Sequence, residues 1–302
     1  MLLSPLLTID TYRPYIFSLE IPLINFTLEP RFYGLFYAIS ILLGYRILIS
    51  EIARRHLPLN ADQAMNFTLL IFLGGLLGGR LYDVIFEWDS FSGKPWWEVF
   101  AVWHGGLAIH GGILGGTLAV YWYTQIKKLR FLEFADIGAL GMILGQAIGR
   151  WGNFTNGEVA GPVTDMWTGV VFPPGSPAYR YAEGQPVHPT MIYESIGNFI
   201  IFAILWRVRL KNFRPGMLLA LHFMLYSFLR SALTPLRMDN QFFTLFGQTF
   251  LAPYTISVVL LAVALLLIWK GRLWEHEDPT PPMSSPPAQR SSKKKRRKRS
   301  DR

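Results

Sequence analysis

Residues 250–269 read FLAPYTISVVLLAVALLLIW, a run of twenty residues without a charged side chain. A helix needs about 20 apolar residues to cross the hydrocarbon core of a bilayer. Six further apolar stretches of similar length precede it, at 33–50, 64–82, 104–123, 134–150, 190–206 and 216–233. We therefore expect an all-α polytopic membrane protein with seven transmembrane helices.

The composition agrees with this expectation and excludes other classes. Hydrophobic residues make up 51% of the 302 residues and charged residues 16%, against about 25% charged in soluble domains. These values exclude a disordered protein and an ordinary cytosolic enzyme. The chain has no cysteine, which excludes disulfides, thiolate metal sites and a cysteine nucleophile on this chain.

Positive charge alternates between the predicted loops. Every second loop is basic, and these loops are predicted on the same side of the membrane as the basic C-terminal tail. They contain Arg54 and Arg55; Lys127, Lys128 and Arg130; and Arg207, Arg209, Lys211 and Arg214. Lys and Arg accumulate on the cytoplasmic side of membrane proteins. The N-terminus is therefore predicted outside and the C-terminus in the cytoplasm.

The chain divides into a membrane domain and a tail. Residues 1–275 are expected to form the transmembrane domain, with the Gly- and Pro-rich outer loop 151–189 as a small extracytoplasmic cap. Residues 276–302 are rich in Pro and Ser and then basic, which predicts a disordered cytoplasmic tail. Attraction to anionic membrane lipids, or a pure topology signal, accounts for this charge. No nucleic-acid partner is expected.

Three arginines lie at the outer ends of their predicted spans: Arg80, Arg150 and Arg230. An arginine within the bilayer costs at least ~2.5 kcal/mol, and few acidic residues lie near enough to pair with them. The guanidinium fork binds phosphate through paired hydrogen bonds. We expect the three side chains to converge on an anion, of which a phospholipid head group is the most abundant at that depth.

His110 and the glycines of the spans have two interpretations each. A histidine inside a span is either a packed core residue or a group that accepts and donates a proton. Glycines recur at 74, 75, 78 and 79, at 111, 112, 115 and 116, and at 141, 145 and 149. Small residues at this spacing allow close helix packing, which we expect for most of them. No metal-ligand spacing is present, so neither a metal nor a cofactor is expected.

The segment Gly149-Arg-Trp-Gly-Asn-Phe-Thr-Asn-Gly-Glu-Val-Ala-Gly161 closely resembles the diagnostic motif of the bacterial prolipoprotein diacylglyceryl transferases. Further similar pieces follow the family's order: Phe32-Tyr33-Gly34, Ile109-His110-Gly111-Gly112, His188-Pro189-Thr190 and Tyr193-Glu194. The resemblance covers roughly residues 20–270. One departure is Thr234, because many members carry an acid four residues after the arginine that corresponds to Arg230.

The resemblance implies a multi-pass enzyme of the bacterial plasma (inner) membrane whose active site faces the outer leaflet. It implies transfer of the diacylglyceryl group of phosphatidylglycerol to the lipobox cysteine in the signal peptide of a prolipoprotein, with glycerol phosphate leaving. This is the first step of bacterial lipoprotein maturation. Membrane lipids are therefore partners as well as solvent.

On this resemblance, three residues are candidates for catalysis. Arg150 is expected to grip the lipid phosphate and Arg230 to orient or stabilise the leaving group. His110 is the candidate base, or the group that orients the thiol. The expected phosphatidylglycerol-binding residues are Arg150, Asn153, Asn156, Glu158, Gly161, Tyr33, Tyr226, His188 and Arg80, with Glu158 also a candidate for holding an arginine in place.

Two other classes of function remain at this point. A transporter or channel also has intramembrane polar residues and glycine-broken helices, but it needs polar groups across the midplane to both faces. A receptor or scaffold with seven spans does not require three arginines at one depth.

Overall fold

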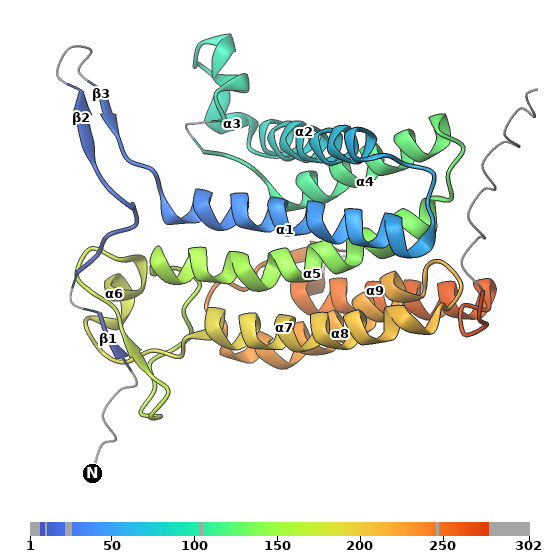
Figure 1. Cartoon of the computed structure of the whole chain (residues 1–302). Coiled ribbons are helices and arrows are strands. Elements are labelled where there is room, and N and C mark those ends of the chain that lie inside the picture. The colour runs from blue at the N-terminus through green and yellow to red at the C-terminus, as the bar shows by residue number, and fades with distance from the viewer. Residues whose placement is uncertain (1–6, 10, 22–25, 103–104, 246–247, 278–302) are drawn as a thin grey trace, which may run out of the picture.

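The computed structural model describes residues 7–9, 11–21, 26–102, 105–245 and 248–277. In this part of the chain, long helices lie side by side in one bundle (Figure 1). They are α1 (Phe32–Arg55), α2 (Ala61–Phe86), α4 (Ile109–Ile126), α5 (Phe131–Thr155), α7 (Thr190–Val208), α8 (Met217–Leu233) and α9 (Ala252–Gly271). The predicted disordered tail, apart from residues 276–277, lies outside the described residues.

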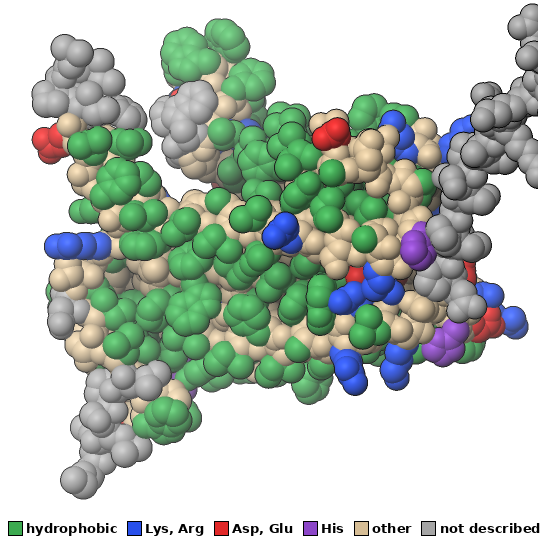
Figure 2. Space-filling model, viewed as in Figure 1, with side chains coloured by type: hydrophobic (Ala, Val, Ile, Leu, Met, Phe, Trp, Pro, Cys, Tyr) green, Lys and Arg blue, Asp and Glu red, His purple; other side chains and the backbone are tan. Residues whose placement is uncertain are grey.

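The helices are arranged in layers. Helices α2 and α4 form one side, α1 and α5 lie in the middle, and α7, α8 and α9 form the other side (Figure 1). The main buried core joins α1, α5, α7 and α8 around Phe134, Leu140, Ile143 and Leu205. Figure 2 shows hydrophobic side chains along the flank of the bundle, as expected of a surface that contacts lipid.

In the part of the chain that the structure describes, six helices are long and apolar enough to cross a membrane, and the chain is therefore a multi-pass membrane protein. They are α1, α2, α5, α7 with the following turn η4 (Arg209–Lys211), α8 with η5 (Thr234–Leu236), and α9. Helix α4, which contains four glycines, His110 and Gln125, is not among them. A crossing by α4, and with it the predicted seven-span topology, stays a prediction.

Several helices have limits that differ from the predicted ones, and two of these differences lie near residues of the predicted site. The third span, predicted from 104, is helical from Ile109, because Gly105 and Gly106 have φ angles of 91° and 74°. Such positive values favour glycine and interrupt a helix. The fourth, predicted to end at 150, continues to Thr155. The first half of the motif 149–161 is therefore helical, and the cap begins about five residues later than expected.

The glycines of α2 and α4 bring the two backbones into direct contact. A Cβ atom added at Gly78 would lie 2.4 Å from the carbonyl oxygen of Gly111, and one at Gly115 would lie 2.2 Å from that of Gly74. No side chain fits at either position. The prediction that these glycines serve helix packing is confirmed for this pair of helices.

The basic loops meet at one end of the bundle. Glu51, which is fully buried near the end of α1, pairs with Arg54, Arg55 and, from the α7–α8 connection, Arg209. Arg130, before α5, pairs with Glu277, after α9. The loops predicted to share one side of the membrane therefore share one end of the structure.

The opposite end contains the cap and two β-hairpins. In the cap, β4 (Val170–Val171) pairs in parallel with β1 (Leu7–Thr8) and lies near the short helix α6 (Pro177–Ala182). A separate buried cluster around Phe172, Val187 and Met191 holds the cap together. The hairpins are β2 (Leu19–Ile21) with β3 (Phe26–Leu28), and β5 (Phe242–Leu245) with β6 (Gln248–Leu251). The remaining short elements, α3 (Trp88–Phe91) and η2 (Trp96–Phe100), follow α2.

Candidate functional site

A buried carboxylate gathers three arginines beneath the cap. Glu194, in the first turns of α7, has 1% of its surface exposed. Its Oε1 lies 2.5 Å from Nη2 of Arg150, and its Oε2 lies 2.5 Å from Nη1 of Arg237 and 4.0 Å from Nη1 of Arg230. We call these four residues the Glu194 network. A buried charge is tolerated when it is paired in this way.

The ends of three elements build the network. Arg150 lies near the C-terminal end of α5, Arg230 lies in the last turn of α8, and Arg237 follows η5. Arg237 also pairs with Asp239, to whose Oδ1 its Nε donates at 2.8 Å. Burial alone would raise the pKa of Asp239, but the hydrogen bonds and positive charge of Arg237 hold that pKa below its usual value. In direct ion pairs, three guanidinium groups thus face two carboxylates, Glu194 and Asp239.

One of the three arginines has an unused donor. Nη1 of Arg230 is buried and has no hydrogen-bond partner among the described residues. A buried donor without a partner costs free energy, and functional sites are where such a cost is usually found. This guanidinium is therefore suited to a ligand that brings its own negative oxygen atoms.

An amide pair orients Arg150. Oδ1 of Asn153 accepts a hydrogen bond from Nη1 of Arg150 at 3.0 Å. Oε1 of Glu158 accepts from Nδ2 of Asn153 at 3.1 Å and from Nδ2 of Asn156 at 3.2 Å. Glu158 thus reaches Arg150 through Asn153, and the carboxylate that pairs directly with the arginines is Glu194.

Gly161 closes the motif where three segments meet. A Cβ atom here would lie 2.5 Å from the carbonyl oxygen of Leu236 and 2.8 Å from Cβ of His188. The backbone N–H of Gly161 donates to the carbonyl of His188 at 2.8 Å, and its carbonyl accepts from the hydroxyl of Tyr181 at 3.0 Å. Burial raises the pKa of Tyr181 to about 12, so this hydroxyl stays protonated as a donor at neutral pH. The arrangement fixes the cap against the start of α7 and the end of α8.

The two predicted tyrosines lie close to the network or to the motif. Tyr33, in the first turn of α1, packs directly over Gly152, where a Cβ atom would lie 2.5 Å from the ring. Tyr226 lies one turn before Arg230 on α8, within the electrostatic field of Glu194 and Arg150. Both positions border the arginines of the network.

Arg80 and His110 lie apart from the network. The Arg80 guanidinium donates to backbone carbonyls before and after residues 103–104, including Val99 at 2.8 Å and Gly105 at 2.7 Å. His110 is exposed, with its ring centroid 6.0 Å from that of Tyr82, and no contact between it and the network occurs among the described residues. The expected meeting of three arginines holds for Arg150 and Arg230 but is wrong for Arg80, because backbone carbonyls occupy its donors.

Comparisons with known proteins identify the family. The family model described as prolipoprotein diacylglyceryl transferase matches residues 22–270. The chain belongs to this family. It is 37% identical over 242 residues to the phosphatidylglycerol–prolipoprotein diacylglyceryl transferase of Halalkalibacterium halodurans, covering 80% of this chain and 82% of that protein. Proteins of the same name from Gloeobacter violaceus and Clostridioides difficile are each 39% identical, over 217 and 215 residues; these matches cover 70% and 71% of this chain and 78% and 82% of the relatives.

One residue of this family member departs from the expected pattern. Thr234 stands at the position where the family resemblance predicts an acid. Its side chain is 1% exposed, and its Oγ1 donates a hydrogen bond to the carbonyl of Arg230 at 2.7 Å. The acid that contacts the Arg237 side of the network is instead Asp239. The substitution therefore leaves no buried carboxyl at position 234 and preserves the helix end.

Sequence reasoning missed two members of the network. Glu194 enters the sequence analysis only as part of the family pattern, without a role, and Arg237 does not enter it. The signal for Glu194 was an acid at the start of an apolar span, which requires a positive partner. Nothing local in the sequence indicates that Arg237 folds back to supply one, because that contact depends on the turn η5.

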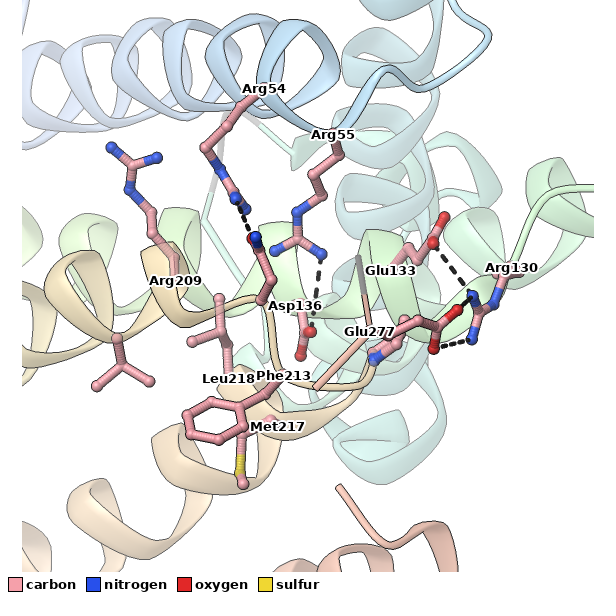
Figure 3. Close-up of a pocket in the computed structure, with 13 residues that line it drawn as sticks. Arg54, Arg55, Arg130, Glu133, Asp136, Arg209, Phe213, Met217, Leu218 and Glu277 are labelled. Carbon is pink, nitrogen blue, oxygen red and sulfur yellow. Dashed lines mark hydrogen bonds and ion pairs between the residues drawn. The ribbon is translucent and has the colours of Figure 1, made fainter. Parts of the chain in front are cut away.

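A pocket at the opposite end of the bundle has a different character. It is lined by residues of α1, α5, α8, the α7–α8 connection and the segment after α9, among them Arg54, Arg55, Asp136, Arg209 and Glu277 (Figure 3). Its arginines are paired with acids: Arg55 lies 3.8 Å from Asp136, and Arg130 pairs with Glu277. The hydrogen bonds from Arg130 lower the pKa of Glu277. None of the predicted site residues lines this pocket.

Among the described residues, no three His, Asp or Glu side chains are grouped as metal ligands.

Proposed function

We propose that this chain transfers the diacylglyceryl group of phosphatidylglycerol to the lipobox cysteine of a prolipoprotein, the first step of bacterial lipoprotein maturation. The observation that carries the proposal is the Glu194 network, in which Nη1 of Arg230 is buried without a hydrogen-bond partner among the described residues. Family membership supplies the substrate class, since the relatives are named for phosphatidylglycerol and prolipoprotein.

In this reaction the cysteine sulfur attacks the glyceryl carbon that bears the phosphate. A carbon–sulfur bond forms, the carbon–oxygen bond to phosphate breaks, and glycerol phosphate leaves with the bonding electron pair. Arg150 grips the phosphate, and Arg230 stabilises the charge that develops on the leaving oxygen atoms. One preorganised donor of this kind contributes about 2.7–4 kcal/mol to lowering the barrier.

The thiol must lose its proton before or during the attack. A free cysteine has a pKa near ~8.5, so a base or a positive field has to raise the thiolate fraction. His110 is the candidate base or orienting group. It lies on the exposed first turn of α4 beside Tyr82, apart from the network, so in this role it acts on the peptide substrate rather than on the bound phosphate.

The remaining residues shape the head-group site. Asn153, Asn156 and Glu158 keep Arg150 in one orientation, and Gly161 with His188 joins the cap to the network. Tyr33 and Tyr226 border the arginines and complete the walls. We assign Arg80 to holding the backbone at Gly105 and Gly106, shortly before α4 and His110, in place of the phosphate contact expected from the sequence.

The same proposal includes the orientation of the enzyme. Seven helices cross the bacterial plasma (inner) membrane, the N-terminus and cap lie outside, and the network opens to the outer leaflet. Helix α4 is the seventh crossing: it packs backbone to backbone against α2 and carries no Lys, Arg, Asp or Glu. The chain has no cysteine, so a single introduced cysteine can be labelled selectively by a membrane-impermeant thiol reagent added to cells. Ser92→Cys tests the outer side and His56→Cys tests the cytoplasmic side. Labelling of the first and protection of the second are expected.

The function is tested by incubating purified protein with phosphatidylglycerol labelled in its acyl chains and a lipobox peptide. Label should move to the peptide, and a peptide with serine in place of the cysteine should stay unlabelled. A transporter or channel, the second class considered, would move lipid between leaflets of a vesicle without labelling the peptide. Absence of transfer under conditions that keep the protein folded would overturn the proposal.

A further inference from the structure

Three polar side chains lie one helical turn deeper in the bundle than the Glu194 network. They are Gln146 on α5, Asn198 on α7 and Ser227 on α8. Both polar atoms of the Asn198 amide, Oε1 of Gln146 and Oγ of Ser227 are buried without a hydrogen-bond partner among the described residues. We call these three residues the polar layer.

Helix geometry places the polar layer directly beneath the network. Residues four apart lie on one face of a helix, one turn of 5.4 Å from each other. Gln146 precedes Arg150 by four residues and Asn198 follows Glu194 by four, while Ser227 precedes Arg230 by three. Helices α5, α7 and α8 pack against one another, and Arg150 and Arg230 both approach Glu194, so the three side chains lie on faces that point into the same part of the bundle.

Helix packing does not explain these polar groups. Neighbouring buried polar side chains do bond across the helices: the hydroxyl of Ser195 donates to the carbonyl of Ala147 at 2.8 Å, and the ring of His222 lies 3.2 Å from the carbonyl of Ala139. The first of these bonds joins α7 to α5 next to the layer, since Ala147 follows Gln146 directly. The unpartnered atoms of Asn198 and Ser227 are therefore available to a group that enters the bundle.

A lipid held by the network would bring suitable groups to this depth. In a diacyl phospholipid the two ester carbonyls follow the phosphate along the glycerol backbone, on the side of the bilayer centre. An ester carbonyl accepts hydrogen bonds but cannot donate them. Nδ2 of Asn198 and the hydroxyl of Ser227 are donors, and Oε1 of Gln146 can accept the second amide hydrogen of Asn198.

We propose that the polar layer binds the ester carbonyls of the diacylglyceryl group, with Asn198 and Ser227 as donors, and so selects ester-linked over ether-linked lipid. This inference rests on the proposed function, since it concerns the same bound lipid. Phosphate and ester are then held one turn apart on the same three helices, which fixes the glyceryl carbon between them for attack.

The test compares phosphatidylglycerol with its dialkyl ether analogue, which lacks both carbonyls, as donors in the labelled transfer reaction. For the wild type we expect kcat/KM to be at least about fivefold higher for the diester, the change given by one hydrogen bond of typical strength. Asn198→Leu and, separately, Ser227→Ala should each lower this ratio towards one, mainly through reduced transfer from the diester. Ser195→Ala is the matched control, because it removes a hydroxyl that is already bonded, and its ratio should equal that of the wild type.

The outcomes separate the two proposals. A wild type that transfers neither lipid would overturn the proposed function. A wild type that uses diester and diether equally, or a ratio that stays unchanged in both variants, would overturn the ester site alone. If Asn198→Leu does not fold, Ser227→Ala decides, because loss of one buried hydroxyl leaves the packing volume nearly unchanged. An equal loss for both lipids would assign the layer to structure rather than to substrate.

Discussion

Oε1 of Glu194 on α7 lies 2.5 Å from Nη2 of Arg150 on α5, across 44 residues of sequence. The pair joins the start of one helix to the end of another at the point where the cap begins. It also holds one guanidinium in place while leaving Nη1 of Arg230 without a hydrogen-bond partner among the described residues. Substrate binding therefore depends on an Arg150 that Glu194 holds in place and on an Arg230 that keeps a donor for the ligand.

Replacing Glu194 by glutamine should destabilise the protein and inactivate it. The change keeps the shape but removes the negative charge, so three arginines repel one another in a buried site. Breaking a buried pair costs about 3–5 kcal/mol, which thermal unfolding in detergent would report as a lower Tm. Glu20→Gln, on the exposed strand β2, is the control and should unfold like the wild type. An unchanged Tm for Glu194→Gln would show that the network is not a buried ion pair.

Arg150→Lys should reduce kcat about 10²–10³-fold although the charge is kept, since one preorganised donor contributes this much. A lysine supplies a point charge and cannot bond Glu194, Asn153 and a phosphate in the same fixed plane. Arg130→Lys, at the opposite end and with a largely exposed side chain, should retain activity within about twofold. Full activity of Arg150→Lys in the transfer assay would refute phosphate recognition by the guanidinium fork.

Gly161→Ala should lower activity more than tenfold. The added methyl group would meet the carbonyl of Leu236 at 2.5 Å, and shifting that backbone moves the adjacent Arg237. Gly138→Ala, in α5 with nothing within 4 Å of the added atom, controls for the general effect of the substitution and should be neutral. Equal activities of the two variants would show that the close contact at Gly161 does not position the network.

Arg80→Gln should act on the protein differently from Arg150→Lys. Loss of the guanidinium frees the carbonyls of Val99, Gly105 and Gly106, so we expect faster proteolysis next to these residues and a lower Tm. The KM for phosphatidylglycerol should change less than twofold in the folded fraction. A large rise in that KM, with unchanged proteolysis, would return Arg80 to the phosphate site that the sequence suggested.

Asp239 should make stability sensitive to acid. Arg237 holds the pKa of Asp239 in the folded protein below its ordinary value of 3.8. The ionised carboxylate therefore stabilises the fold fully at pH values above 3.8, and this stabilisation is lost as the pH falls through the pKa of the folded protein. Tm should therefore drop below about pH 4. Asp239→Asn should show a smaller drop over the same range, because the residue no longer titrates. Identical pH profiles of the two proteins would mean that the pair adds no stability.

Much of the membrane fold could be predicted from the sequence. Long apolar runs, alternating basic loops and paired glycines each follow from local composition, and Gly78 and Gly111 do pack backbone to backbone. Helix ends were less accurate, because they depend on single residues. Gly105 and Gly106 take positive φ and delay α4, while no positive-φ residue interrupts α5 before Gly157.

The sequence indicated several residues of the site, but it did not indicate which of them pair with one another. Arg150 and Arg230 were expected to meet, and both approach Glu194. Arg80 looked equivalent in sequence, but the carbonyls that occupy it come from a loop whose path local patterns do not indicate. Arg237 and Asp239 enter the network only through the turn after α8. Pairing of this kind is set by tertiary structure.

The most direct test of the account is binding of a short-chain phosphatidylglycerol to the detergent-solubilised protein, followed by isothermal titration calorimetry. Arg230→Gln should bind at least tenfold more weakly than the wild type, because it removes the free guanidinium donor from the network. Arg130→Gln, at the other end of the bundle, should bind like the wild type. Equal affinity of Arg230→Gln and the wild type would contradict the claim that the arginines around Glu194 hold the lipid phosphate.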